Sequence, residues 1–154
     1  MNKTQQIKYL VSAAMLLASK KACNEPSFIK WWEIVKACHK VGYLYVATEG
    51  NAVATALIAY RIPELKEDSG YDIPLKESGK TLFIQACASQ GSDKFKLVKL
   101  MNWYRKANRG VTRFAYRRRG GNKIIVRNFE EREHGKQKRT KHTGRTGVSA
   151  KSVC

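Results

Sequence analysis

Acidic side chains are nearly missing from the last third of this chain. From Arg105 to Cys154 the sequence has sixteen Lys and Arg residues against three acidic ones, Glu130, Glu131 and Glu133, which is a local net charge of +13. A surface that only needs solvation normally mixes both signs of charge, whereas a region of one sign attracts polyanions and releases their counterions. The shortage of acid therefore predicts a polyanionic partner, nucleic acid first and an acidic protein surface second.

Cysteines at metal-ligand spacing are absent as well. Cys23, Cys38, Cys87 and Cys154 are widely separated, with no Cys-x-x-Cys motif and no nearby pair of histidines. This spacing argues against a zinc site, and we predict no bound metal. Because three of the four lie in apolar segments, we expect buried thiols, no disulfides and a reducing compartment.

Long hydrophobic runs are also lacking. The apolar stretch from Tyr9 to Ala18 is too short to span a bilayer. The spacing of its apolar residues is typical of one face of a helix rather than of a secretory signal. These residues are Ile7, Leu10, Val11, Ala14, Leu17 and Ala18. We therefore predict a packed first helix in an intracellular protein without a membrane span.

Apolar periodicity and turn signals predict the order α-α-β-β-β-α-β-β. This is a mixed α/β (α+β) fold with helices packed on a mainly antiparallel sheet. The second helix should run from Ser27 to His39, and the third over residues 92–108. The apolar face predicted for the third helix consists of Leu97, Leu100, Met101, Tyr104 and Ala107. The strands are expected at residues 43–48, 52–62, 81–88, 111–119 and 123–129, and residues 63–80 should form a surface loop. Because apolar residues almost vanish after Phe129, we predict one globular domain over residues 1–129 and a basic flexible tail over residues 130–154.

Four short motifs occupy the middle of the chain: Glu49 to Tyr60 (EGNAVATALIAY), Ser78 to Ile84 (SGKTLFI), Ala88 to Gly91 (ASQG) and Leu97 to Met101 (LVKLM). They resemble the toxin-activating lysine acyltransferases, a GNAT-like family, over about residues 43–129. The resemblance implies a GNAT-like fold. It also implies acyl transfer from acyl-CoA or an acyl carrier protein thioester to a protein lysine or another amine.

The residues that this chemistry needs are replaced here. The resemblance implies a catalytic His near Cys23 or Asn24, and an acidic residue after Ile84, where this chain has Gln85. An amide cannot act as a carboxylate base. The remaining catalytic candidates are His39, the only histidine of the domain, together with Cys23 and Gln85.

Gln90, Gly91 and Ser92 are the candidates for cofactor contact. GNAT-like enzymes hold the cofactor pyrophosphate on a glycine-rich loop at a helix N-terminus. The loop here has one glycine and continues into Asp93, whose charge repels phosphate. We therefore predict no cofactor for a silent domain, and an acyl thioester cofactor for an active one.

A second resemblance involves the third helix and the strand after it. The sequence Leu100 to Lys106 (LMNWYRK) follows Lys94-Phe95 and precedes Phe114-Ala115-Tyr116. It is similar to the small GNAT-like internal virion proteins of short-tailed phages. This resemblance implies other virion or assembly proteins as partners, with a location in the host cytoplasm and inside a viral particle.

Basic residues concentrate on the predicted last hairpin and in the tail. Alternation places Arg113, Arg117 and Arg119 on one face of the strand, together with Val111, and Tyr116 on the other, so the arginines could follow a phosphate backbone. No acidic residue occurs between Arg113 and Arg127. The candidate nucleic-acid-binding residues are Arg113, Arg117, Arg118, Arg119, Lys123, Arg127, Lys136, Lys138, Arg139 and Lys141.

Three hypotheses follow from the sequence. The first is a catalytically silent GNAT-like virion or assembly component that contacts nucleic acid or partner proteins through its basic hairpin and tail. The second is an acyl-CoA-dependent acyltransferase in which His39 or Cys23 acts as base or nucleophile. The third is an RNA-binding protein unrelated to either family. We favour the first.

Overall fold

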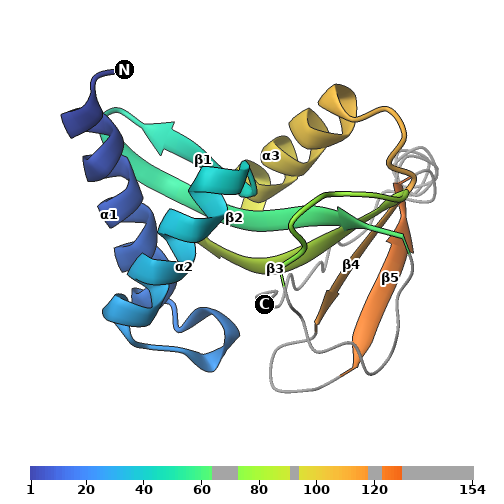
Figure 1. Cartoon of the computed structure of the whole chain (residues 1–154), viewed down its shortest axis with the longest axis horizontal. Helices are drawn as coiled ribbons and strands as arrows, with labels where there is room; N and C mark the ends of the chain where they lie inside the picture. Colours follow the sequence, from blue (N-terminus) through green and yellow to red (C-terminus); the bar gives the residue numbers. More distant parts are fainter. Residues whose placement is uncertain (64–72, 91–93, 118–122, 130–154) are drawn as a thin grey trace, which may run out of the picture.

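The computed structural model describes residues 1–63, 73–90, 94–117 and 123–129 of the chain, with the side chains of 94–96 left out. The described part is a mixed α+β fold of three α-helices and a five-stranded sheet, as predicted (Figure 1). In chain order its elements are α1 (Lys3–Ser19), the 3₁₀ helix η1 (Ala22–Asn24), α2 (Phe28–Val41), β1 (Leu44–Glu49), β2 (Ala52–Ile62), β3 (Thr81–Ser89), α3 (Lys94–Ala107), β4 (Arg113–Arg117) and β5 (Ile124–Asn128).

Local signals fix the ends of the first two helices. Asn2 caps α1 by accepting a hydrogen bond from the Gln5 N–H at 2.8 Å. Ser27 caps α2, and Gly42 ends it with a φ of 81°, a conformation that favours glycine. The predicted second helix is thus confirmed, with its end at Val41 instead of His39.

The sheet has the strand order β1-β2-β3-β4-β5. Three neighbouring pairs are antiparallel, and β3 and β4 are parallel. A parallel pair needs a crossover connection, which α3 supplies. The predicted mainly antiparallel sheet and its central β3 strand are confirmed.

Helices cover both faces of this sheet (Figure 1). α1 and α2 pack on one face, around a core that includes Leu17, Trp31 and Tyr60. α3 packs on the other face, around a second core that includes Leu57, Tyr104 and Phe114. No helix in the described ranges is long and apolar enough to cross a membrane.

A β-bulge interrupts the pairing of β2 and β3. Ile58 pairs with Ala86 and Ala59 pairs with Ile84, so Gln85 is an extra residue in β3. A bulge turns two consecutive side chains to the same side of a sheet, here Gln85 and Ala86 on the α1–α2 face. The parallel pairing with β4 reaches only as far as the Ile84–Tyr116 pair, so Gln85 lies where that pairing stops.

Three sequence predictions need correction. Ile7 and Ala107 were expected on buried helix faces, but both are exposed. Ile7 lies near the start of α1 and Ala107 at the end of α3, where the helices extend beyond the apolar core. The strand predicted over residues 111–119 begins at Arg113 and not at residue 111, and is described as far as Arg117, because residues 118–119 lie outside the described ranges. Val111 precedes it and is buried on the α3 side with Phe114, so the predicted alternation does not extend to Val111.

Candidate functional site

Two catalytic candidates that lie 62 residues apart in the chain meet on the α1–α2 face. The Cys23 thiol of η1 donates a hydrogen bond to the main-chain carbonyl oxygen of Gln85 at 3.2 Å. Lys21, Cys23 and Asn24 all have positive φ angles, of 48°, 52° and 59°. Such conformations cost about 1 kcal/mol or more each in non-glycine residues. This turn directs the Cys23 side chain at the bulge.

The Cys23 side chain is exposed, which contradicts the expectation of a buried thiol. Cys38 is buried, Cys87 is half-buried, and none of the three described cysteines forms a disulfide. Burial raises the pKa of the Cys38 thiol to about 11. Cys38 is thus an unreactive core residue, and Cys23 is the accessible thiol of the three.

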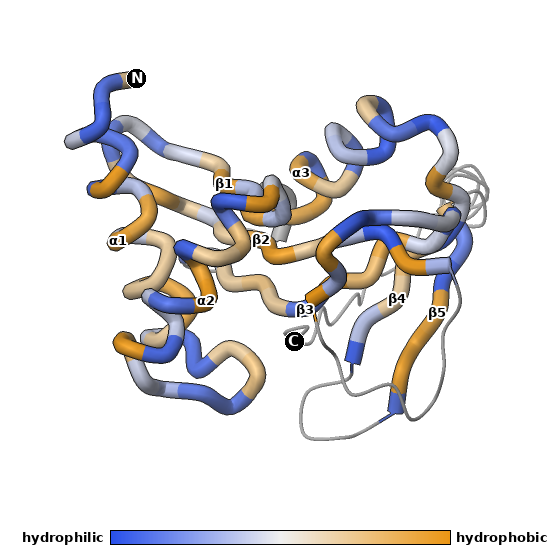
Figure 2. Tube along the Cα trace, in the orientation of Figure 1, coloured by the Kyte–Doolittle hydropathy of each residue, from blue (hydrophilic) through white to orange (hydrophobic). Residues whose placement is uncertain are grey.

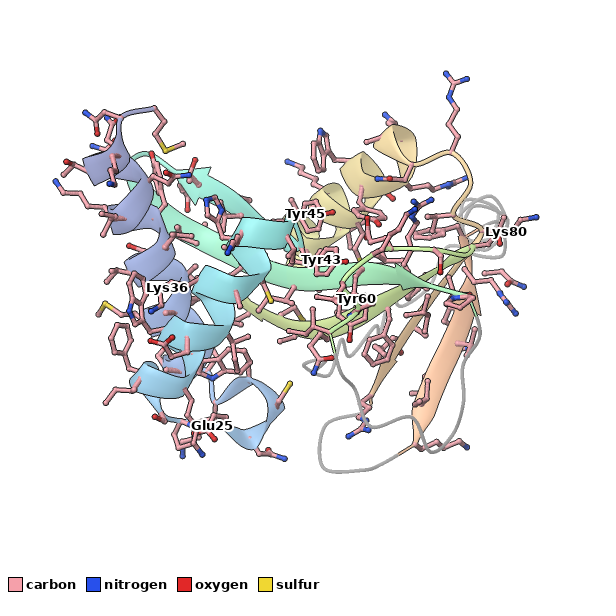
Figure 3. All side chains as sticks on the ribbon, in the orientation of Figure 1. Glu25, Lys36, Tyr43, Tyr45, Tyr60 and Lys80 are labelled. Atoms are coloured by element: carbon pink, nitrogen blue, oxygen red, sulfur yellow. The ribbon has the colours of Figure 1, made fainter. Side chains whose placement is uncertain are left out.

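The Gln85 side chain has a structural partner. Tyr60 donates its hydroxyl to Gln85 Oε1 at 2.8 Å. The Tyr60 ring packs between Tyr43, at 5.4 Å between centroids, and Phe83, at 5.8 Å. Figure 3 shows Tyr43 and Tyr60 close together over the sheet. An amide in this position orients neighbours by hydrogen bonds but cannot accept a proton as a base.

His39 does not join this pair. It lies in the last turn of α2, where its Nε2 is 2.7 Å from Gln6 Nε2 of α1. Cys23 lies before Phe28, the first residue of α2. His39 is eleven positions after Phe28, which is roughly 16 Å along the helix. The structure therefore brings Cys23 and Gln85 together and keeps the histidine apart.

The predicted cofactor loop is described only at its first residue. Gln90 is exposed, and its N–H donates to the Ala54 carbonyl at 2.8 Å at the end of the β2–β3 pair. Gly91 and Ser92 lie outside the described residues.

The β4–β5 hairpin carries cations on both faces. Residues directly opposite each other in an antiparallel pair share a face. Arg113 and Arg117 share one face of β4, as predicted, while Tyr116 lies on the other, toward the α3-side core. Arg127 pairs with Phe114 and so lies on the face of Tyr116. Arg113, Lys123 and Arg127 are exposed.

The remaining nucleic-acid candidates cannot be placed in the same way. Arg118, Arg119 and the tail candidates lie outside the described ranges. These tail residues are Lys136, Lys138, Arg139 and Lys141.

The carboxylates of the described residues lie elsewhere. Glu25 pairs with Lys30 at 2.9 Å, and Glu33 pairs with Lys36 at 2.7 Å. The hydrogen bond from Lys30 lowers the pKa of Glu25. In the part of the chain that the structure covers, no ion pair involves Arg113, Lys123 or Arg127.

The outer face of α3 adds to this basic surface. Lys99, Lys106 and Arg109 are exposed, and the Trp103 side chain is 58% exposed beside them. Figure 2 shows hydrophilic residues along the outer turns of α3 and its connection to β4. Trp103 was not singled out from the sequence. Trp103 does not lie on the apolar face predicted for the third helix, and this position is the sequence signal for an exposed ring.

A polar network under α3 also escaped the sequence analysis. Glu77 accepts hydrogen bonds from the Arg61 N–H at 3.0 Å and from the Tyr104 hydroxyl at 3.2 Å. The Tyr45 and Tyr104 rings meet edge to face at 5.1 Å. Burial, with the nearby Glu77 carboxylate, raises the pKa of Tyr45 to about 12 and raises that of Tyr104 as well. Because these contacts are long-range and polar, no local sequence pattern predicts them.

Comparisons with known proteins leave the chain without an assigned family. No protein-family model matches it, and neither does any curated protein or any solved structure.

Proposed function

We propose that this protein binds nucleic acid independently of sequence, through a basic side formed by α3, β4 and β5. Between Asp93 and Glu130 the sequence contains seven Arg, five Lys and no acidic residue. This run is the single observation that carries the proposal. A surface of one sign binds polyanions by counterion release.

The geometry of the exposed cations supports the proposal. Arg113 and Arg127 lie on opposite faces of a two-stranded hairpin, and Lys123 lies at its turn end. Cations distributed in this way would meet phosphates around the β5 edge of the sheet and do not converge on one base edge. Such contacts fix position on a nucleic acid without reading its sequence.

Arginine is more frequent than lysine among the cationic residues of this side. Its planar guanidinium binds phosphate through two parallel hydrogen bonds, whereas an ammonium acts as a point charge. Residues 1–60 contain no arginine, so α1 and α2 have lysine alone. The arginines are thus concentrated where phosphate contact is proposed.

The biological setting that we propose is a catalytically silent assembly component of a phage-type particle. Its support is the resemblance of residues 94–116 to internal virion proteins, together with the separation of His39 from Cys23 and Gln85. Detection of the chain by mass spectrometry in purified particles would support this setting. Its absence from particles whose host cells contain it would contradict it.

The binding proposal is tested with a triple variant and a matched control. Arg113→Ser, Lys123→Ser and Arg127→Ser are combined in one variant, and Lys3→Ser, Lys8→Ser and Lys40→Ser in the other. All six side chains are exposed, and neither set forms an ion pair within the described residues. At low salt the first variant should bind a DNA duplex about 100-fold more weakly than the parent, while the control and His39→Ala stay within about threefold. Equal losses in both triple variants would contradict the proposal.

A second candidate function, acyl transfer, is favoured by the contact between Cys23 and Gln85. The Cys23 thiolate would attack the thioester carbonyl, forming a Cys23 thioester and releasing the carrier thiol. An acceptor amine would then attack this thioester, releasing Cys23 and forming an amide. Saturable acyl-CoA binding, lost in Gly91→Glu, and a mass increase of one acyl group, lost in Cys23→Ser, would support this function. Failure to bind acyl-CoA would eliminate it.

A further inference from the structure

One tryptophan of this protein lies on the surface. Trp31 is buried at 3% exposure and Trp32 is half-buried, whereas Trp103 is 58% exposed on α3. An indole gains more than almost any other side chain from leaving water. A large aromatic side chain that stays in water beside other apolar groups indicates a contact surface.

The Trp103 ring is held in place without being covered. Tyr45 of β1 contacts it at 5.9 Å between centroids with an interplanar angle of 62°. Tyr45 is itself held edge to face by the buried Tyr104. Among the residues that the structure describes, no ring stacks parallel on Trp103. Because its ring contact among the described residues is tilted, the Trp103 indole is suited to parallel stacking by a planar ligand.

A shallow apolar groove adjoins this ring. It has a volume of about 410 Å³ and is lined by Leu44, Tyr45, Val46, Leu100 and Trp103. Its lining residues come from α3 and from β1, the edge strand of the sheet. The groove is large enough for a planar aromatic ligand and has no carboxylate in its lining.

Lysines flank Trp103 along the helix. Lys99 is four residues before it and Lys106 three residues after it, so all three share the outer face of α3. Lys99 and Lys106 are both exposed, and neither forms an ion pair with a described residue. The two lysines are seven positions apart, which is roughly 10 Å along the helix. An aromatic ring with a cation on each side is the arrangement by which proteins bind single strands.

We propose that Trp103 stacks on an unpaired base of a single-stranded nucleic acid, with Lys99 and Lys106 contacting the phosphates on either side. The inference rests on the proposed nucleic-acid binding and specifies its substrate. In a duplex both faces of each base are already stacked, so Trp103 gains nothing there unless a base is flipped out. A polyanion is favoured over a neutral protein segment because the two cations that flank Trp103 on α3 match the charge of phosphates.

The experiment compares two fluorescently labelled probes at one low salt concentration: a dT₂₀ strand, and the same strand paired with dA₂₀. Trp103→Leu keeps an apolar side chain and removes the ring, while Trp103→Tyr keeps a ring. We expect Trp103→Leu to weaken binding of the single strand about tenfold and to leave duplex binding within about twofold. Trp103→Tyr should restore single-strand binding to within about threefold of the parent. Lys99→Gln with Lys106→Gln should weaken single-strand binding more than the control Lys3→Gln with Lys8→Gln.

Other results would overturn the inference in distinguishable ways. Unchanged single-strand binding in Trp103→Leu, or an equal loss on both probes, would refute stacking while leaving the proposed function intact. Self-association of the parent that Trp103→Lys abolishes, with unchanged binding of both probes, would identify the groove as a protein interface. Failure of the parent to bind either probe would refute the proposed function itself.

Discussion

The helical side of this protein, residues 3–41 of α1, η1 and α2, differs from the basic side, residues 94–129 of α3, β4 and β5. The helical side has seven Lys and two Glu, and both glutamates form ion pairs with lysines. The basic side has twelve Lys and Arg and no acid. In Figure 3, Glu25, which follows η1, and Lys36 of α2 lie on the helical side, and Lys80, which precedes β3, lies at the opposite end of the molecule.

The helices of the two sides, α1 with α2 and α3, each pack on one face of the same sheet over an apolar core, so the difference in charge does not come from folding alone. Ion pairs between exposed side chains stabilise a protein by less than about 1 kcal/mol, and a surface without acid loses little stability from lacking them. A cluster of like charge is mildly destabilising until a counter-charge binds it. This difference is what we expect if the helical side serves stability and the basic side, as proposed, contacts a polyanion.

The largest expected effect comes from comparing two tryptophans. Trp31→Ala removes a buried ring whose Nε1 donates to the Glu25 carbonyl at 2.8 Å, and should lower the free energy of unfolding by roughly 3–5 kcal/mol. Trp103→Ala should lower it by less than about 1 kcal/mol. Urea unfolding followed by circular dichroism measures both. Similar losses would show that Trp103 is a structural residue and remove the contrast.

A smaller effect is expected at Gly79, where the segment before β3 supports the basic side. Its φ is 88°, and a Cβ there would collide with the Ile62 carbonyl and the Pro63 Cα. The main-chain carbonyl of the next residue, Lys80, accepts hydrogen bonds from the N–H groups of Thr112 and Arg113. Gly79→Ala should lower the free energy of unfolding by roughly 3 kcal/mol. The matched control Gly110→Ala, whose Cβ meets no atom within 4 Å, should change it by less than about 1 kcal/mol.

The two sides should also respond differently to alkaline pH. The pKa of Cys38, on the helical side, is raised to about 11, and that of Tyr45, beneath α3, to about 12. A group with a raised folded-state pKa ionises first in the unfolded chain, so stability falls as pH rises. The loss from Cys38 should extend from about pH 9 to 11 and that from Tyr45 from about pH 10 to 12. Cys38→Ala should flatten the earlier part of the decline and Tyr45→Phe the later part. A parent protein whose stability is constant from pH 8 to 12 would contradict both assignments.

The smallest effect is expected from the ion pairs of the helical side. Lys36→Gln removes the partner of Glu33, and the side chains of Lys36 and Glu33 are 41% and 66% exposed. The free energy of unfolding should change by less than about 0.5 kcal/mol, and nucleic-acid binding should not change. If Lys36→Gln weakened nucleic-acid binding as much as a basic-side variant does, binding would depend on net charge and not on the position of the cations.

Much of the fold could be predicted from sequence because its signals are local. Ser27 and Gly42 mark the ends of α2, and the apolar run of β3 predicted its central position. The parallel pairing of β3 with β4 and the bulge at Gln85 were not predicted, since both depend on strand register. The contact of Cys23 with Gln85 joins residues far apart in the chain, and no spacing rule indicates it.

Charge patterning predicted the cations of the hairpin but not their distribution over two faces. Arg127 lies opposite Phe114 because of the β4–β5 register, which the sequence leaves open. The exposure of Trp103 follows from the way α3 packs with Tyr104 toward the sheet. Composition thus predicts a class of partner, which remains a prediction, and packing determines which side chains are exposed.

The most direct test of nucleic-acid binding by the basic side is the salt dependence of duplex affinity. Each phosphate contact contributes about 0.9 to the slope of log affinity against log salt concentration. The variant with Arg113, Lys123 and Arg127 changed to Ser should therefore have a slope smaller by about 2 to 3 than that of the parent, while the Lys3, Lys8 and Lys40 variant keeps the parent slope. Identical slopes for all three proteins would contradict the account.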